Sequence, residues 1–390
     1  MPGRSKPQYA QFWTAVDMAS DGIIPITMPK WGLSMSEGKV VDWLVKEGDS
    51  VERGSEIVEV ETEKIASGVE STASGTLRRA VAASGEILPV GALLGVMTQS
   101  EISDDEIDSF VTEFQENFVP EEVSEEDQGI ELQYVEIDGM KLSYVRQGDG
   151  EQVAVLLHGF GGDLNNWLFN QSVLAEKRTV YAFDLPGHGS STKRIGDSSL
   201  ESIAEALYQA IRTLQVDGAD WVGHSMGGAL VLQIANAHPD CVNSMTLIGS
   251  AGLGDEINVP YLEGFVNSQS RRELKPHVEQ LFNDTSLVNR QLLEDLLKFK
   301  RIDGVKDVLN DVLSGFVSDG KQAARWTEVV EKDNSRVLVI WGAEDKILPA
   351  QHARNLPGHI QTHILDSYGH MVQMEAASEV NQLIVDFWSS

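Results

Sequence analysis

A serine framed by glycines is the first candidate for chemistry in this sequence, because residues 223–227 read GHSMG. The segment DWV before it has strand character, and GGALVLQIANAHP after it has the composition of a helix. In a G-x-S-x-G turn between a strand and a helix, the serine is forced to face outward and the glycines let the backbone approach closely. Ser225 is therefore the predicted nucleophile of a covalent reaction.

A serine hydroxyl is a weak nucleophile until a base removes its proton, and the sequence supplies a base downstream. His370 lies in SYGHMVQ after the last predicted strand, and Asp345 lies in VLVIWGAEDKILP at the end of another strand. Asp345 would fix the tautomer of the imidazole and stabilise the imidazolium. Glu344 is the rival acid, but the spacing of WGAEDKILP resembles hydrolases that use the second acidic residue, which favours Asp345.

Such a reaction also needs donors for the oxyanion that forms. The glycine-rich segment HGFGG, residues 158–162, ends a predicted strand upstream of the serine. We expect the backbone N–H groups of Phe160 and Met226 to form the oxyanion hole, because backbone donors need no particular side chain. His158 and His224 border the same pocket, and we interpret both as loop supports that hydrogen bond rather than titrate.

The elements that position these residues begin near residue 132, where strand-like and helix-like segments start to alternate. This alternation predicts a largely parallel sheet covered by helices, and such sheets bind ligands beyond the carboxyl ends of their strands. Residues 132–390 resemble the α/β-hydrolase superfamily. Residues 255–333 interrupt the strand pattern with helical, charged sequence, and we expect them to form a cap over the active site that decides the choice of substrate.

A second candidate for chemistry is Lys64, in the segment EVETEKIASGVES at residues 59–71. Residues 38–60 can be laid over residues 75–97 with a constant offset, which predicts two copies of one β-unit. Each copy is too small to enclose a core alone, so the two should pair as small sheets around a shared interior. Lys64 would then lie in the hairpin that joins them. The matched glycines are Gly38, Gly48 and Gly54 in one copy and Gly75, Gly85 and Gly91 in the other.

Residues 23–98 resemble a lipoyl domain, from TMPKWGLSMSEGKVVDWLVKEGDSV to VETEKIASGVES. The resemblance implies a small all-β flattened barrel whose hairpin lysine, here Lys64, carries lipoate through an amide bond. The related biotinyl domains have methionines beside this lysine. Glu63 and Ile65 stand there in this sequence, which favours lipoate.

An acidic linker is predicted over residues 99–131, because no Lys or Arg occurs between Arg79 and Lys141. Such a charge run resists collapse. Apolar residues recur within it at helical spacing, so we expect a short amphipathic helix that docks on a neighbouring domain, or on a partner protein as the alternative. Residues 1–22 are expected to be a disordered tail without the apolar core of a secretory signal, and Met18 is an alternative start.

Composition excludes several classes of function. The formal net charge of −30 opposes binding to nucleic acid, and no apolar run approaches the about 18 residues that would span a membrane. The single cysteine, Cys241, rules out an internal disulfide and fits a reducing compartment such as the cytoplasm. No metal site is expected.

A lipoyl domain joined to a serine-triad domain resembles the E2 components of acetoin cleaving systems. The resemblance implies an acetyltransferase that passes an acetyl group from the lipoyl arm to coenzyme A. It also implies three protein partners: a thiamine-diphosphate-dependent E1, dihydrolipoamide dehydrogenase (E3) and a lipoate-attaching enzyme. The sequence lacks the HxxxDG motif and the basic subunit-binding module of ordinary 2-oxo acid dehydrogenase E2 chains, so their large symmetric core is not expected.

Basic residues in the predicted cap are candidates for binding the phosphates of coenzyme A, namely Arg271, Arg272, Lys300 and Arg301. Solvated helix faces with local ion pairs are the alternative. Two other functions stay open for the chain. It could be a lipoyl-tethered serine hydrolase, thioesterase or carbon–carbon bond hydrolase that releases the acyl group to water. It could also be an acyl carrier whose hydrolase domain only binds partners.

Overall fold

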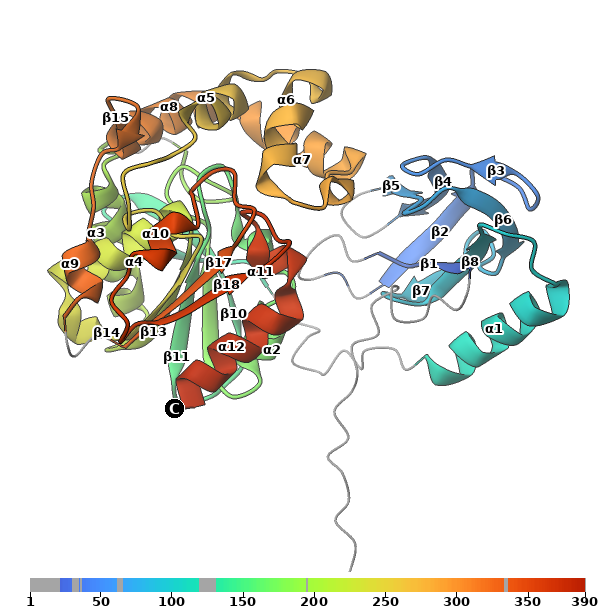
Figure 1. Cartoon of the computed structure of the whole chain (residues 1–390), viewed down its shortest axis with the longest axis horizontal. Helices are drawn as coiled ribbons and strands as arrows, with labels where there is room; N and C mark the ends of the chain where they lie inside the picture. The colour runs from blue at the N-terminus through green and yellow to red at the C-terminus, as the bar shows by residue number, and fades with distance from the viewer. Residues whose placement is uncertain are drawn as a thin grey trace, which may run out of the picture. The chain divides into compact units, whose positions relative to one another are not determined.

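The computed structural model describes residues 22–29, 35, 37–61, 66–118, 131–193, 196–332 and 336–389. The chain divides into two compact units, Met1–Gln128 and Gly129–Ser390 (Figure 1). Residues 1–21, on which most of the predicted tail falls, lie outside the described residues, and so does Lys64. In the described part of the chain, no helix combines the length and the apolar character needed to cross a membrane.

The larger unit is built on an eight-stranded sheet whose order is β18-β17-β14-β13-β11-β12-β10-β9. Strands β9 and β10 pair antiparallel, β10 also pairs antiparallel with β12, and the remaining neighbours are parallel, as predicted from the alternating pattern. The strands are β9 Gln133–Ile137, β10 Met140–Gln147, β11 Val153–Leu157, β12 Thr179–Phe183, β13 Ala219–His224, β14 Val242–Ile248, β17 Val337–Gly342 and β18 Gln361–Leu365.

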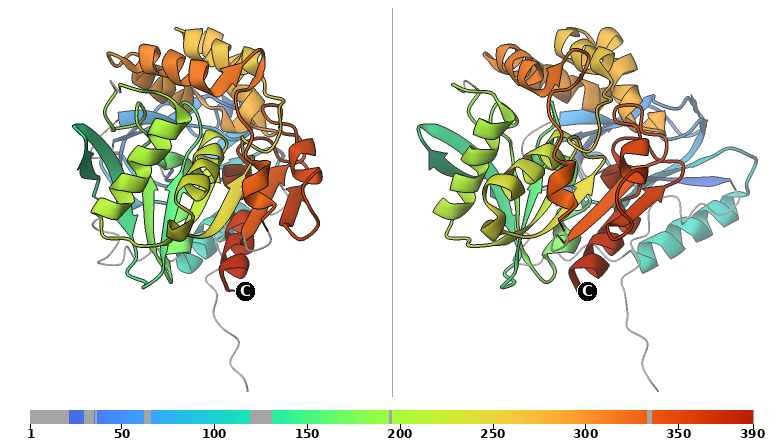
Figure 2. Two further views of the ribbon diagram at one scale, coloured as in Figure 1. Left: turned by 90° about the vertical axis from the view of Figure 1, so that its left-hand side faces the viewer. Right: turned by 60° about the vertical axis from the view of Figure 1, so that its left-hand side comes forward.

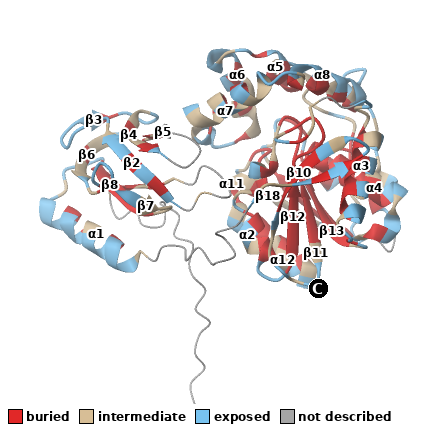
Figure 3. Cartoon of the chain, turned by 180° about the vertical axis from the view of Figure 1, so that it is seen from behind, coloured by how far each residue is buried: buried red, intermediate tan, exposed pale blue. Residues whose placement is uncertain are grey.

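Helices cover both faces of this sheet, with α3 and α4 on one face and α2 and α12 on the other (Figures 1 and 3). The strands between them are buried along most of their length, which agrees with their continuous apolar sequences. The helices are α2 Gln171–Ala175, α3 Leu200–Thr213, α4 Met226–Ala237, α10 Gln351–Arg354, α11 Val372–Glu375 and α12 Ala377–Ser389.

The predicted helical cap is inserted between β14 and β17 and lies over one end of the sheet (Figures 1 and 2). Phe265 of α5 packs on Phe160 in the loop after β11, with ring centroids 6.2 Å apart, so the cap covers the carboxyl ends of the strands. It consists of α5 Val259–Asn267, α6 Arg271–Val278, α7 Arg290–Lys300, α8 Val305–Phe316, the strand pair β15 Val317–Ser318 and β16 Lys321–Gln322, and α9 Thr327–Val330.

The smaller unit contains two four-stranded antiparallel sheets around one apolar interior, as the internal repeat predicts. Its turns repeat as well: Gly48 and Gly85 have φ of 93° and 86°, and Gly54 and Gly91 both have φ of 82°. A left-handed conformation at matching positions explains why glycine recurs there. One sheet has β1 Ile23–Thr27, β8 Leu93–Thr98, β6 Gly75–Ala80 and β3 Ser50–Val51, and the other has β5 Ala66–Glu70, β4 Glu56–Glu61, β2 Glu37–Trp43 and β7 Ile87–Pro89.

The hairpin that should present Lys64 is described on both sides of its turn. Strands β4 and β5 pair antiparallel up to Glu61 opposite Ala66. Residues 62–65 join these two ends, and they lie outside the described residues. The register of the flanking strands fits the predicted hairpin, and the exposure of Lys64 at its tip stays a prediction.

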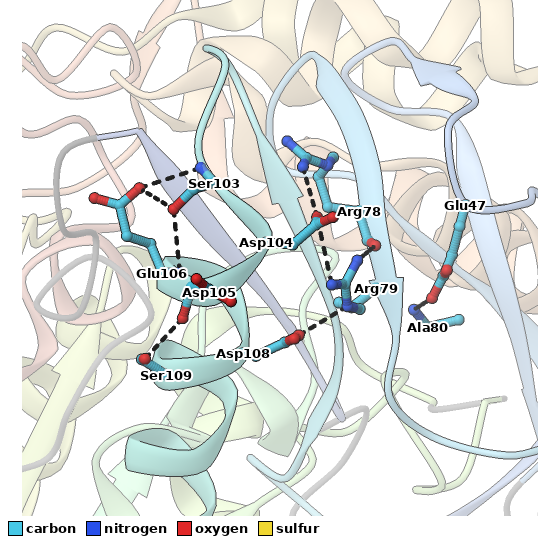
Figure 4. Close-up of polar contacts among 10 residues, drawn as sticks. All are labelled: Glu47, Arg78, Arg79, Ala80, Ser103, Asp104, Asp105, Glu106, Asp108 and Ser109. Atoms are coloured by element: carbon cyan, nitrogen blue, oxygen red, sulfur yellow. Dashed lines mark hydrogen bonds and ion pairs between the residues drawn. The ribbon is translucent and has the colours of Figure 1, made fainter.

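The acidic segment after β8 contains a helix, α1 Asp104–Asn117. A capping box begins it: Ser103 Oγ accepts from the N–H of Glu106, and Glu106 Oε2 accepts from the N–H of Ser103 at 3.1 Å (Figure 4). Arg78 Nη2 lies 2.9 Å from Asp104 Oδ1 (Figure 4). The buried face of the helix packs on β1 and β8 through Ile107, Phe110 and Phe114 against Ile23, Leu93 and Val96. The helix is thus part of the smaller unit.

Replacing Ile107 with alanine tests this packing. Ile107 is fully buried, and removing its side chain should lower the unfolding free energy of the smaller unit by about 2 to 5 kcal/mol. Amides of β8 in the full chain should then exchange with deuterium at least about 10-fold faster. Glu113→Ala, on the exposed face of α1, is the matched control. Faster exchange in α1 alone would mean that the helix does not stabilise the sheets.

Candidate active site

Ser225 occupies a sharp turn between β13 and α4, with φ of 55° and ψ of −119°. A Cβ at Gly223 would lie 2.4 Å from the carbonyl oxygen of Gly227, and a Cβ at Gly227 would lie 2.2 Å from that of Leu157. Larger residues at either glycine would therefore displace the backbone. The turn is also tied to β14, since the N–H of Ser225 donates to the carbonyl of Ile248 at 3.0 Å. This strained geometry is that of a nucleophile elbow.

His370 and Asp345 form a buried pair beyond the ends of β17 and β18. The distance from His370 Nδ1 to Asp345 Oδ2 is 2.7 Å, and the two side chains are 3% and 0% exposed. The second carboxylate oxygen accepts from the N–H groups of Ile347 at 2.8 Å and Leu348 at 2.9 Å. A fixed carboxylate on Nδ1 leaves Nε2 as the basic nitrogen. Glu344, the rival acid, is exposed.

The structure brings this pair to the serine turn. The ring of His224, the residue before Ser225, lies 4.6 Å from the ring of His370, and its Nε2 donates to the carbonyl of His370 at 3.0 Å. Among the described residues, no hydrogen bond involves Ser225 Oγ. In enzymes without substrate, catalytic hydrogen bonds are often long and tighten only in the complex.

The predicted oxyanion donors also converge on the serine. A Cβ at Gly159 would lie 3.0 Å from Ser225 Cβ, so the loop that carries Phe160 lies directly against the turn. Met226 is the first residue of α4, where an N–H has no partner within its helix. Within the described residues, neither the N–H of Phe160 nor that of Met226 donates a hydrogen bond. Both are therefore free for an oxyanion, and their role stays a prediction.

Three buried histidines support the loops around the serine. His158 Nδ1 lies 2.8 Å from the carbonyl of Gly159, and its Nε2 accepts from the N–H of Leu185 at 3.0 Å. His188 Nε2 accepts from the N–H of Gly161 at 3.0 Å. Burial lowers the pKa of His158 to about 4, that of His188 to about 3, and that of His224 well below its usual value. They are neutral and hydrogen bond to the backbone, so His370 stays the predicted base.

Replacing His188 with glutamine should change how stability depends on pH. Burial lowers the pKa of His188 to about 3, so below pH of about 6.5 only the unfolded chain binds this proton. The stability that the parent gains from neutral His188 therefore decreases as the pH is lowered, by up to about 1.4 kcal/mol per pH unit. Asp163, whose pKa burial raises to about 6, titrates in both proteins. Denaturant unfolding from pH 7 to 5 should show the parent's advantage shrinking, whereas a constant advantage would contradict a neutral His188.

The cap residues proposed for coenzyme A differ in their surroundings. The ammonium of Lys300 donates to the carbonyls of Phe265 and Ser268, and partial burial lowers its pKa to about 8. Lys300 therefore holds the end of α5, which fits the structural alternative better than phosphate binding. Arg271 pairs with Glu294 at 3.5 Å. Arg272 and Arg301 are exposed, and neither forms an ion pair with a described residue.

Phe265 is part of the site although nothing in the sequence pattern indicates it. A Cβ at Gly161 would lie 2.4 Å from Phe265 Cε1, so the ring of this cap residue closes over the glycine-rich loop. Tyr261, one turn earlier on α5, is buried beside it, with ring centroids 6.3 Å apart. The spacing of these two aromatic residues predicts a buried helix face, and only the fold shows that this face meets the loop of Phe160.

Comparison with known families agrees with this geometry. Residues 153–377 match the family described as alpha/beta hydrolase fold, and residues 24–97 match the family described as biotin-requiring enzyme. The larger unit is also similar to a solved meta-cleavage product hydrolase from Pseudomonas fluorescens, with a TM-score of 0.60 and 23% identity over 66% of this chain and 97% of that one. At this level of identity the likeness shows the fold alone.

Curated relatives cover both units. The chain is 45% identical, over 94% of its length and 97% of the relative's, to the dihydrolipoyllysine-residue acetyltransferase component of acetoin cleaving system of Cupriavidus necator. It is 47% identical to the Pseudomonas putida protein of the same name, over 93% and 97% of the two chains. A 2-hydroxy-6-oxononadienedioate/2-hydroxy-6-oxononatrienedioate hydrolase of Paraburkholderia phymatum is 26% identical over 64% of this chain and 91% of that one. The chain therefore belongs to the family of dihydrolipoyllysine-residue acetyltransferase components of acetoin cleaving systems.

Proposed function

We propose that the chain transfers an acetyl group from the thiol of a lipoyl group on Lys64 to coenzyme A. The observation that carries this proposal is the buried 2.7 Å contact between His370 and Asp345 beside the strained turn of Ser225, in a chain that also contains a lipoyl-type unit. The names of the relatives identify the carrier and the acyl group.

The first half of the reaction forms an acyl-enzyme. Ser225 Oγ attacks the carbonyl carbon of the thioester while its proton passes to His370 Nε2. The N–H groups of Phe160 and Met226 donate to the oxyanion, and Asp345 stabilises the imidazolium. When the carbon–sulfur bond breaks, His370 returns the proton to the leaving thiol, and the acetyl group remains on Ser225 Oγ. Bound lipoate supplies this carrier thiol.

The second half regenerates the serine. The thiol of coenzyme A attacks the acetyl carbonyl while His370 accepts the thiol proton, and the same proton then returns to Ser225 Oγ as its bond to the acetyl group breaks. Water competes with the thiol in this step. Exclusion of water by the cap, with Phe265 over the glycine-rich loop, would favour transfer.

Hydrolysis is the second candidate, because the larger unit resembles a hydrolase named for 2-hydroxy-6-oxononadienedioate. The same serine, histidine and aspartate would then pass the acyl group to water. Incubating acetyl-lipoylated protein with coenzyme A and measuring acetyl-CoA against free acetate separates the two. We expect acetyl-CoA in excess. Acetate as the main product at saturating coenzyme A would assign a thioesterase.

The relatives are named as components of a system, which fits an assembly of several proteins. We propose the thiamine-diphosphate-dependent E1, dihydrolipoamide dehydrogenase and a lipoate-attaching enzyme as partners, in the bacterial cytoplasm. A dithiol carrier would receive the acetyl group from the E1 and pass electrons to dihydrolipoamide dehydrogenase.

Reversing charge at Arg271 and Arg272 tests whether α6 helps to bind coenzyme A. Both side chains are exposed, so each phosphate contact would contribute less than about 1 kcal/mol. The double Glu variant should then raise the KM for coenzyme A by about 5- to 30-fold and leave that for pantetheine nearly unchanged. The double variant Lys177→Glu with Lys332→Glu, at exposed positions outside α6, changes the net charge by the same amount and is the control. Equal losses for both thiols would indicate cap misfolding, and no loss would make these arginines solvated surface residues.

A further inference from the structure

The loop that carries His370 is fastened by one carboxylate that the reaction itself does not use. Glu375, at the end of α11, accepts three backbone hydrogen bonds. Its Oε1 accepts from the N–H of Asn283 at 2.8 Å and from the N–H of Asp284 at 2.9 Å. Its Oε2 accepts from the N–H of Gly369 at 2.6 Å. One side chain thus joins the cap to the residue directly before His370.

Further contacts connect the same two segments. The N–H of Met371 donates to the carbonyl of Leu281 at 3.0 Å, and Asn283 Nδ2 donates to the carbonyl of Ser367 at 2.8 Å. A Cβ at Gly369 would lie only 2.7 Å from the backbone nitrogen of Asn283, so the cap segment lies directly against the loop. His370 is therefore flanked by Gly369, which is hydrogen bonded to Glu375, and by Met371, which is hydrogen bonded to Leu281 of the cap.

We propose that Glu375 is a positioning residue that couples the position of the cap to the position of the His370 imidazole. The inference rests on the proposed role of His370 as the base for Ser225. Hydrogen bonds to an ionised carboxylate are stronger than those between neutral groups, so this side chain can hold the two segments together. If the cap shifts, the carboxylate moves the backbone of Gly369, and His370 Nε2 moves relative to Ser225.

Glu375→Gln keeps the shape of the side chain and replaces one acceptor oxygen by an NH₂ group. Because NH₂ cannot accept a hydrogen bond, the variant loses either the bonds to Asn283 and Asp284 or the bond to Gly369. Glu379→Gln, at an exposed position on α12, is the matched control. The measurement is the rate constant with which a fluorophosphonate labels Ser225 in the full chain, followed by intact mass. This probe needs the serine and its base but neither lipoate nor coenzyme A.

We expect Glu375→Gln to label about 10- to 100-fold more slowly than the parent, because misplacement of a catalytic group by about 1 Å has effects of this size. Labelling should stay slower than in the parent even at the pH where it is fastest, because the base is misplaced rather than missing. A role in folding alone would lower the fraction of protein that can be labelled without changing the rate constant. Glu379→Gln should behave as the parent.

Asn283→Ala removes the hydrogen bond from Asn283 Nδ2 to the carbonyl of Ser367. Because Asn283 is exposed, this variant provides a second test if Glu375→Gln does not fold. It should slow labelling less than Glu375→Gln, and it should raise the share of acetate over acetyl-CoA as the cap loosens. Rates equal to those of the parent in both variants would overturn the inference. Failure of the parent itself to label would instead sink the proposed chemistry of Ser225, so the two failures are distinguishable.

Discussion

Ser225→Ala is expected to lower acetyl transfer to coenzyme A by about 10⁴-fold or more, because it removes the atom proposed to carry the acetyl group. His370→Ala should have an effect of similar size. The double variant should be hardly worse than either, because residues that act as one unit lose function non-additively. Transfer from the acetyl-lipoylated chain, measured as acetyl-CoA formed per second, gives the comparison. Ser378→Ala, on the surface of α12, is the control.

Asp345→Asn refines this test. The asparagine cannot keep His370 in the required tautomer, so transfer should fall by up to about 10⁴-fold although the packing is preserved. Glu344→Gln, next to it and exposed, should have little effect. Near-normal transfer by Ser225→Ala would show that coenzyme A attacks the thioester directly and that the serine turn has another purpose.

Lys64→Arg should abolish acetyl transfer in the complete system, because arginine cannot form the amide with lipoate. Intact-mass analysis of the parent, made with lipoate available, should show one added lipoyl group that the variant lacks. The hydrolase unit of the variant should still react with a fluorophosphonate at the parent rate, since arginine keeps the charge of lysine and position 64 belongs to the other unit.

Lys39→Arg and Lys46→Arg are the controls for Lys64, because both lysines lie exposed in the same unit. They should keep the added mass and the activity of the parent. A lipoyl group found at either of these positions, or one that persists in Lys64→Arg, would contradict the assignment. A modified chain that transfers nothing would point to the serine turn instead.

The parts of the site that the sequence predicted are those that local backbone geometry dictates. The turn at Ser225 cannot form without small residues at Gly223 and Gly227, so its motif is visible in one line of sequence. The internal repeat was visible for the same reason, since left-handed turns at Gly48 and Gly85 require glycine at matching positions.

The parts that the sequence did not predict depend on distant packing. Lys300 reads as one basic residue among several, and only the meeting of α5 and α7 turns its ammonium toward the carbonyls of Phe265 and Ser268. Glu375 is five residues beyond His370, but its partners at Asn283 and Asp284 come from another part of the chain. No periodicity or local spacing could reveal such contacts.

The docking of α1 on β1 and β8 changes how the two units can be separated. A fragment that ended at residue 98 would expose Ile23, Leu93 and Val96 together, and such an apolar patch promotes self-association. A cut that separates the two units without uncovering this patch must therefore fall after α1 and the residue that follows it, Phe118.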